Sequence, residues 1–124
     1  MKRNYFLIAL AASSMVVAIL AQNTPATSQE KKAVASKSSE AAAKGKEVFD
    51  QKCSICHFAD SNARKIGPGL KGLSKRGTFS VNNKKVTTEN LTMWIENGDS
   101  LMPPFKDVLD AQQIKDVVAY VKTL

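Results

Sequence analysis

The sequence predicts a small helical domain, because three segments carry helical signals and no alternation of strands and helices links them. These segments lie at about residues 39–52, 88–97 and 111–123. An alternating pattern would instead indicate a parallel sheet. Residues 41–124 are enough for one domain with a thin hydrophobic core.

Residues 1–21 are expected to form an export signal. Lys2 and Arg3 give it a basic start, and a 17-residue run without charge follows from Tyr5 to Ala21. Such a segment is typical of a leader that is cleaved, here after Ala21. The alternative is an uncleaved membrane anchor, since 17 residues are at the low end for a span. Either way, the rest of the chain is expected outside the cytoplasm, in the periplasm.

Residues 22–40 are expected to be a flexible polar linker. They are rich in Ala, Ser, Thr, Lys and Gln, and Val34 is their only large aliphatic residue. Such a composition buries too little apolar surface to order the segment. The linker is either a passive spacer or, for a membrane-anchored domain, a tether.

The first helix of the domain is expected to run from Ser39, a favourable N-cap residue, to Lys52. Gly45 precedes Phe49 by one turn, so the two share a face. A glycine inside a helix costs about 1 kcal/mol relative to alanine. Gly45 therefore either permits a close helix crossing or is a tolerated surface residue.

The domain is organised around Cys53-Ser54-Ile55-Cys56-His57. In a helical turn Cys53, Cys56 and His57 share one face, because they stand at i, i+3 and i+4. This C-x-x-C-H pattern is typical of c-type haem attachment, in which two thiols bind the porphyrin and the histidine binds iron. The alternatives are a redox disulfide, a chance match, and half of a zinc site. Zinc needs four ligands, and the chain has two cysteines and one histidine.

A rigid loop is expected at Gly67-Pro68-Gly69-Leu70, ten residues beyond His57. Two glycines around a proline specify a sharp bend with little side-chain bulk. Such a loop can pass close to the haem and offer a backbone carbonyl to the second nitrogen of His57. Ligating histidines usually have a partner of this kind.

Residues 61–88 form a basic stretch, with seven basic residues and no acidic one. The net charge of the chain is +7, or +5 without Lys2 and Arg3. The stretch either steers the protein to an acidic partner or a membrane surface, or is a solvated surface that balances the haem propionates. Nucleic acid is not an expected partner of an exported protein. A small hairpin is expected at residues 78–83.

A short helix is expected from Thr88, its N-cap, to Asn97, where Asn-Gly ends it. Leu91, Trp94 and Ile95 share one face of this helix. Trp94 either packs against the haem pocket or donates its indole N–H to a propionate.

Met102 is expected on a rigid strap, because Pro103 and Pro104 follow it. A residue before proline is extended, and two prolines stiffen the chain. Methionine is a known haem ligand that raises the reduction potential. Met93 lies within a helical pattern, where packing is its expected role. Met102 is therefore the candidate sixth ligand.

The last helix is expected from Ala111 to Thr123. Asp110 and Gln113 form a variant of the capping box at its start. An apolar stripe at i, i+3, i+4 and i+7 consists of Ile114, Val117, Val118 and Val121. We expect this stripe to pack on the first helix near Gly45 and Phe49.

Together these motifs resemble a class I cytochrome c, the bacterial single-haem kind, over about residues 41–124. The resemblance rests on the order and spacing of Gly45, Phe49, the C-x-x-C-H stretch, Gly67–Leu70, Met102–Phe105 and Tyr120. It implies an all-α fold of three main helices plus loops around one covalently attached haem c. It implies Cys53 and Cys56 as thioether attachments and Pro68 as the carbonyl partner of the proximal histidine. It also implies His57 and Met102 as the axial ligands of the iron.

The expected function is electron transfer in the periplasm, as in a respiratory chain, by Fe(III)/Fe(II) cycling and not by catalysis. Two axial ligands leave no open position for a substrate. The expected partners are redox proteins with acidic docking surfaces, and the chain is expected to be a monomer that meets a membrane only through an uncleaved anchor. One alternative is the cytochrome c subunit of a larger dehydrogenase or reductase. A haem sensor or peroxidase is the other, and it needs an open sixth position.

Overall fold

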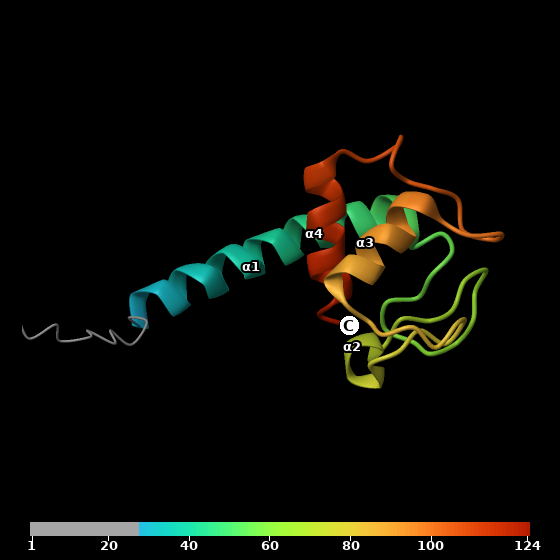
Figure 1. Cartoon of the computed structure of the whole chain (residues 1–124), viewed down its shortest axis with the longest axis horizontal. Coiled ribbons are helices and arrows are strands. Elements are labelled where there is room, and N and C mark those ends of the chain that lie inside the picture. The colour runs from blue at the N-terminus through green and yellow to red at the C-terminus, as the bar shows by residue number, and fades with distance from the viewer. Residues whose placement is uncertain (1–27) are drawn as a thin grey trace, which may run out of the picture.

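The computed structural model describes residues 28–124 (Figure 1). Its elements in chain order are α1 (Ser28–Val48), the π-helical turn η1 (Phe49–Cys53), α2 (Leu73–Arg76), α3 (Thr88–Asn97) and α4 (Ala111–Val121). Within this part of the chain there is no named strand, and the predicted hairpin is reduced to one antiparallel bridge between Thr78 and Lys85. The all-α prediction is confirmed.

The predicted leader, residues 1–21, and residues 22–27 of the predicted linker lie outside the described residues. Among residues 28–124 no helix combines the length and the apolar character that crossing a membrane requires.

Helix α1 begins at Ser28 and not at Ser39, so the predicted helix start was wrong. Ser39 lies inside the helix, where its hydroxyl donates a hydrogen bond to the Ser36 carbonyl (2.8 Å). Residues 28–40 of the predicted flexible linker are therefore helical, and the side chains of 32–40 are exposed. The segment is too polar to be buried, but its Ala, Lys, Glu and Gln residues favour a helix without burial. Figure 1 shows this half of α1 extending away from the other helices.

Helices α1 and α4 cross closely at Gly45. A Cβ atom at Gly45 would clash with the backbone carbonyl of Asp116 and lie 2.9 Å from the Cβ of Tyr120. One turn later, the rings of Phe49 and Tyr120 meet edge to face at 5.3 Å. Of the two roles open to Gly45, the structure supports the close crossing. The last helix packs on the first as predicted.

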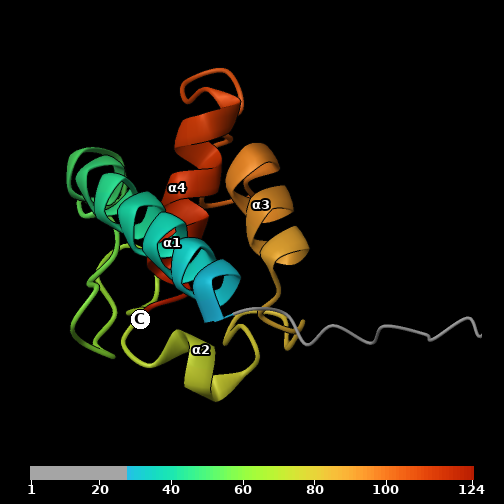
Figure 2. The same cartoon turned by 90° about the vertical axis from the view of Figure 1, so that its left-hand side faces the viewer.

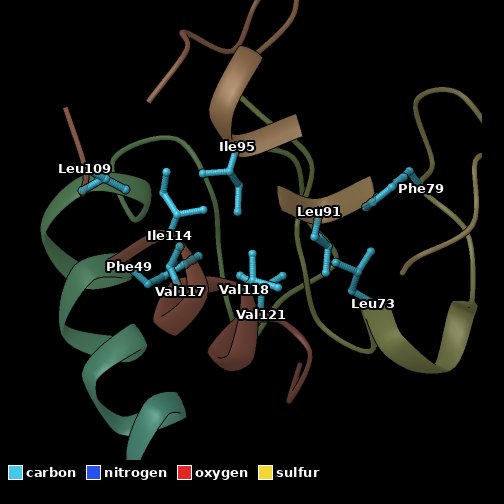
Figure 3. Close-up of a cluster of buried hydrophobic side chains, with 10 residues drawn as sticks. All are labelled: Phe49, Leu73, Phe79, Leu91, Ile95, Leu109, Ile114, Val117, Val118 and Val121. Atoms are coloured by element: carbon cyan, nitrogen blue, oxygen red, sulfur yellow. The ribbon is translucent and has the colours of Figure 1, made fainter. Parts of the chain in front are cut away.

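The hydrophobic core lies between α1, α4 and α3, with α3 beside α4 (Figure 2). Its ten buried hydrophobic side chains, drawn in Figure 3, are Phe49, Leu73, Phe79, Leu91, Ile95, Leu109, Ile114, Val117, Val118 and Val121. The predicted stripe of α4 supplies four of these ten residues. The periodicity of the sequence therefore identified the buried face of α4 correctly.

Both later helices begin with side-chain caps. Asp110 accepts hydrogen bonds from the backbone N–H of Gln113 (2.8 Å), and Gln113 accepts from that of Asp110 (3.0 Å). The predicted capping box is thus present, although α4 ends at Val121 and not at Thr123. Helix α3 is capped by Thr87, which accepts from the Asn90 N–H (3.1 Å), so the cap predicted at Thr88 was one residue late.

Candidate functional site

One cavity of about 360 Å³ brings together the residues that the sequence predicted for the site. Its walls come from η1 and the loop after it, from α2, α3 and α4, and from the proline-containing strap. The six predicted residues that line it are Cys53, Cys56, His57, Pro68, Trp94 and Met102. Segments far apart in the sequence therefore converge on one space beside the core.

The first wall of the cavity is a tight turn at the end of η1. The N–H of Ser54 donates to the Phe49 carbonyl at 2.9 Å, a wide i to i+5 bond that ends the π-helical turn. The N–H groups of Cys56 and His57 then both donate to the Cys53 carbonyl, at 3.0 and 2.9 Å. These i+3 and i+4 bonds are those of a helical turn, and both thiols and the imidazole line the cavity.

The two cysteines are free thiols in the structure. Burial raises the pKa of the Cys53 thiol to about 11, and the neighbouring Cys56 adds to the shift. Redox-active C-x-x-C pairs have lowered pKa values, because the thiolate is the reactive form. The raised pKa is therefore opposite to what a redox disulfide requires. No group of three His, Cys, Asp or Glu side chains that could hold a metal occurs within residues 28–124.

His57 is oriented by the loop that follows it. Its Nδ1 atom lies 2.9 Å from the Pro68 carbonyl oxygen, which can only accept, so Nδ1 is the donor. The neutral ring then carries its free lone pair on Nε2. Gly67 packs against the ring, since a Cβ there would lie 2.8 Å from both ring nitrogens. The N–H of Gly67 donates to the Cys56 carbonyl (2.9 Å), which closes the loop against the cysteine turn.

Met102 approaches the cavity from the strap after α3. It is half-buried and packs against the core, whereas the side chain of Met93 is 48% exposed on α3. Met102, the methionine that the sequence predicted as a ligand, therefore lines the cavity.

Two residues contact the strap backbone: Asp99 was not identified from the sequence, and Gly98 was predicted only as the end of the helix. The carboxylate of Asp99 accepts the N–H of Met102 (2.8 Å), and Gly98 lies against the Met102 carbonyl. An aspartate bonding to backbone N–H groups two or three residues later is a recognisable turn signal.

Trp94 lines the cavity with its ring 5.2 Å from that of Phe79. This contact fits the packing role, and the propionate hydrogen bond stays a prediction. Lys52, Arg64 and Arg76 also line the cavity, and Arg76 donates to the Gly69 carbonyl (3.2 Å). The basic stretch thus contributes two of its arginines to the cavity.

The lining of the cavity fits a covalently attached haem. Two thiols and an imidazole stand on one wall, a thioether reaches the same cavity, and most other lining side chains are apolar. Nitrogen and sulfur are the donors that haem iron takes in electron-transfer proteins. Gly67 lies directly against the His57 ring, where a side chain would displace the imidazole.

Comparison with known proteins agrees with this arrangement. The family model for cytochrome c matches residues 42–124 of the chain. Cytochrome c6 of Bryopsis maxima is 35% identical over 77 residues, which cover 62% of this chain and 84% of that protein. Cytochrome c6 of Rippkaea orientalis is 36% identical over 80 residues, covering 64% of this chain and 68% of that protein. Cytochrome c6 of Leptolyngbya boryana is 39% identical over 80 residues, covering 64% of this chain and 88% of that protein.

The match to the cytochrome c family model includes every predicted site residue and nearly all of the predicted haem domain, residues 41–124. The chain therefore belongs to the cytochrome c family as a class I, single-haem, electron-carrier cytochrome, and it binds one covalently attached haem c.

Proposed function

We propose that the chain shuttles single electrons between redox proteins in the periplasm, with His57 and Met102 as the axial ligands of its haem iron. One observation carries this proposal. His57 and Met102 line the same cavity although 45 positions separate them, and both cysteines stand on the His57 wall. The periplasmic location follows from the export signal expected at residues 1–21.

In this proposal Cys53 and Cys56 attach the haem by thioether bonds. Both thiols belong to the turn whose N–H groups converge on the Cys53 carbonyl, so their spacing is set by the backbone. Attachment at two points beside the proximal histidine fixes the cofactor against this wall.

His57 and Met102 have different tasks. The hydrogen bond from His57 Nδ1 to the Pro68 carbonyl holds the imidazole in one tautomer and raises the basicity of the other nitrogen. The soft sulfur of Met102 favours the reduced metal and raises the potential. When bound, the haem supplies the Fe(III)/Fe(II) couple. The apolar lining excludes water, which also disfavours the additional charge of the oxidised state.

The rim of the cavity supports transient docking of an acidic partner. Ile55 and Leu101 line the cavity with exposed fractions of 63% and 73%. Lys52 and Arg64 line the same cavity and are exposed. An apolar contact with basic side chains beside it suits brief encounters that charge steers and salt weakens. We propose that the chain docks here as a monomer.

The projecting half of α1 favours a second candidate, the cytochrome c subunit of a larger dehydrogenase or reductase. Residues 32–40 are helical and exposed, so they are accessible to a partner or can hold the haem domain at a distance from an anchor. At 1.5 Å per residue, residues 28–40 span about 20 Å. A partner that remains bound during purification at high salt would favour this candidate.

The function is tested by rapid mixing of the reduced, haem-loaded protein with an oxidised acidic redox protein. We expect reversible one-electron exchange without consumption of a substrate. Catalytic consumption of hydrogen peroxide by the same preparation would instead favour the peroxidase alternative.

A further inference from the structure

The strap that carries Met102, residues 101–105, has few backbone N–H groups that can bind it to the rest of the chain. The two prolines that follow Met102 have no backbone N–H. The donors of the strap are therefore those of Leu101, Met102 and Phe105. The Phe105 N–H donates to the Ile95 carbonyl in α3 (3.0 Å), which fixes the far end. The position of Met102 itself depends on the other two donors.

Both of these donors bind one oxygen of one side chain. The N–H groups of Leu101 and Met102 each lie 2.8 Å from Oδ1 of Asp99. In return, the Asp99 N–H donates to the Met102 carbonyl at 2.9 Å. Three hydrogen bonds thus close a tight loop from Asp99 to Met102. Asp99 is exposed, so packing in the core does not account for this arrangement.

Gly98 brings Asp99 into this position. Its φ of +64° lies in the left-handed region, where a side chain is strained. A Cβ atom at Gly98 would also clash with the Met102 carbonyl and lie 2.8 Å from the carbonyl carbon of Pro103. The end of α3 therefore lies directly against the strap.

We propose that Asp99 is a positioning residue, whose carboxylate oxygen holds the Met102 backbone so that the thioether stays on the haem iron. This inference rests on the proposed function, in which Met102 is the sixth ligand. Without the Asp99 acceptor, the N–H groups of Leu101 and Met102 lose their hydrogen-bond partner and turn towards water. Between Gly98 and Phe105 the segment then keeps only the backbone hydrogen bond from the Asp99 N–H to the Met102 carbonyl, and the thioether detaches more easily.

The experiment compares Asp99→Ala, Asp99→Asn and wild type, all exported and loaded with haem. Asparagine keeps the Oδ1 acceptor without the charge, whereas alanine removes both. Asp107→Ala is the control, because Asp107 is an exposed aspartate on the other side of the two prolines. The readouts are the midpoint potential and the fraction of ferrous protein that binds carbon monoxide. Thermal unfolding of each variant is recorded in parallel.

Asp99→Ala is expected to lower the midpoint and to raise the carbon monoxide-bound fraction several-fold. Asp99→Asn and Asp107→Ala are expected to behave as wild type. The inference is overturned if Asp99→Ala keeps the wild-type midpoint and resists carbon monoxide, or if Asp99→Asn changes as much as Asp99→Ala. Failure of the proposed ligation looks different, because wild-type ferrous protein would then bind carbon monoxide readily.

Discussion

The Nδ1 atom of His57 donates a 2.9 Å hydrogen bond to the backbone carbonyl of Pro68. The residue before that proline, Gly67, packs against the same imidazole ring. The orientation of His57 is therefore set by the backbone of a loop that begins ten residues later in the chain. Contact on two sides leaves the ring little freedom to turn.

The first prediction concerns Gly67→Ala, which would place a methyl group within 2.8 Å of both ring nitrogens. The ring must move or lose its bond to Pro68, and disturbing such partners usually costs about 10- to 100-fold in activity. We expect a loss of that size in the rate of electron exchange, together with an altered absorption spectrum.

Gly72→Ala is the matched control for this substitution. Gly72 has a φ of +69°, and a Cβ atom there would point into open space, with no neighbour within 4 Å. We expect the variant to lose about 1–2 kcal/mol of stability from the left-handed backbone. Its spectrum should match that of wild type. Equal spectra and rates in both variants would show that Gly67 does not orient His57.

The second prediction concerns the crossing of α1 and α4. On an exposed helix Gly→Ala stabilises by about 1 kcal/mol, but at Gly45 the new methyl group meets the carbonyl of Asp116. Overpacking of this kind costs about 1–3 kcal/mol, so we expect Gly45→Ala to destabilise the haem-loaded protein by that amount. Denaturant unfolding measures it. Ser39→Ala, exposed on the same helix, should stay within about 0.5 kcal/mol of wild type.

The α4 helix shows which parts of this fold can be predicted from short stretches of the sequence. Asp110 and Gln113 cap it through groups only three residues apart, and its buried face follows a simple 3.6-residue period. Both signals depend only on residues that are close in the sequence, so they can be recognised without knowledge of the tertiary contacts. The start of α1 at Ser28 was not predicted, because residues 28–40 carry too few apolar side chains to be ordered by burial. An exposed helix does not need a buried apolar face.

The site was predictable to a similar degree and for the same reason. Cys53, Cys56 and His57 fall within a single turn, and the proline after Met102 marks the strap. The hydrogen bonds from the N–H groups of Leu101 and Met102 to Asp99 were not predicted, although an aspartate two or three residues before the donors is a known turn signal. The shape of the cavity depends on packing among distant segments, which a linear pattern does not encode.

The third prediction tests the capping box of α4. Asp110 accepts hydrogen bonds from the N–H groups of Gln112 and Gln113, both at 2.8 Å. Asp110→Ala leaves both donors without this partner, and we expect a loss of about 1 kcal/mol in unfolding free energy. Asp107→Ala removes the same charge from an exposed loop and should cost less. If the two variants are equally stable, the cap does not contribute.

The fourth prediction concerns the basic side chains at the cavity rim. Lys52→Ala and Arg64→Ala should each slow electron exchange with an acidic redox protein at low salt. The difference from wild type should shrink as ionic strength rises, because salt screens exposed charges over about 8–10 Å. Lys37→Ala, on the projecting half of α1, removes the same charge far from the cavity. A rate loss as large in Lys37→Ala would mean that net charge, and not the rim, steers docking.

The most direct test of His57/Met102 ligation is an optically monitored redox titration of the haem-loaded protein beside Met102→Ala and Met93→Ala. Met93 is the natural control, because it is a half-exposed methionine on α3. Axial ligands move haem potentials over about 0.8 V. We predict that the midpoint falls by about 0.1 V or more in Met102→Ala and stays at the wild-type value in Met93→Ala. An unchanged midpoint in Met102→Ala would contradict the claim that Met102 and His57 together hold the iron.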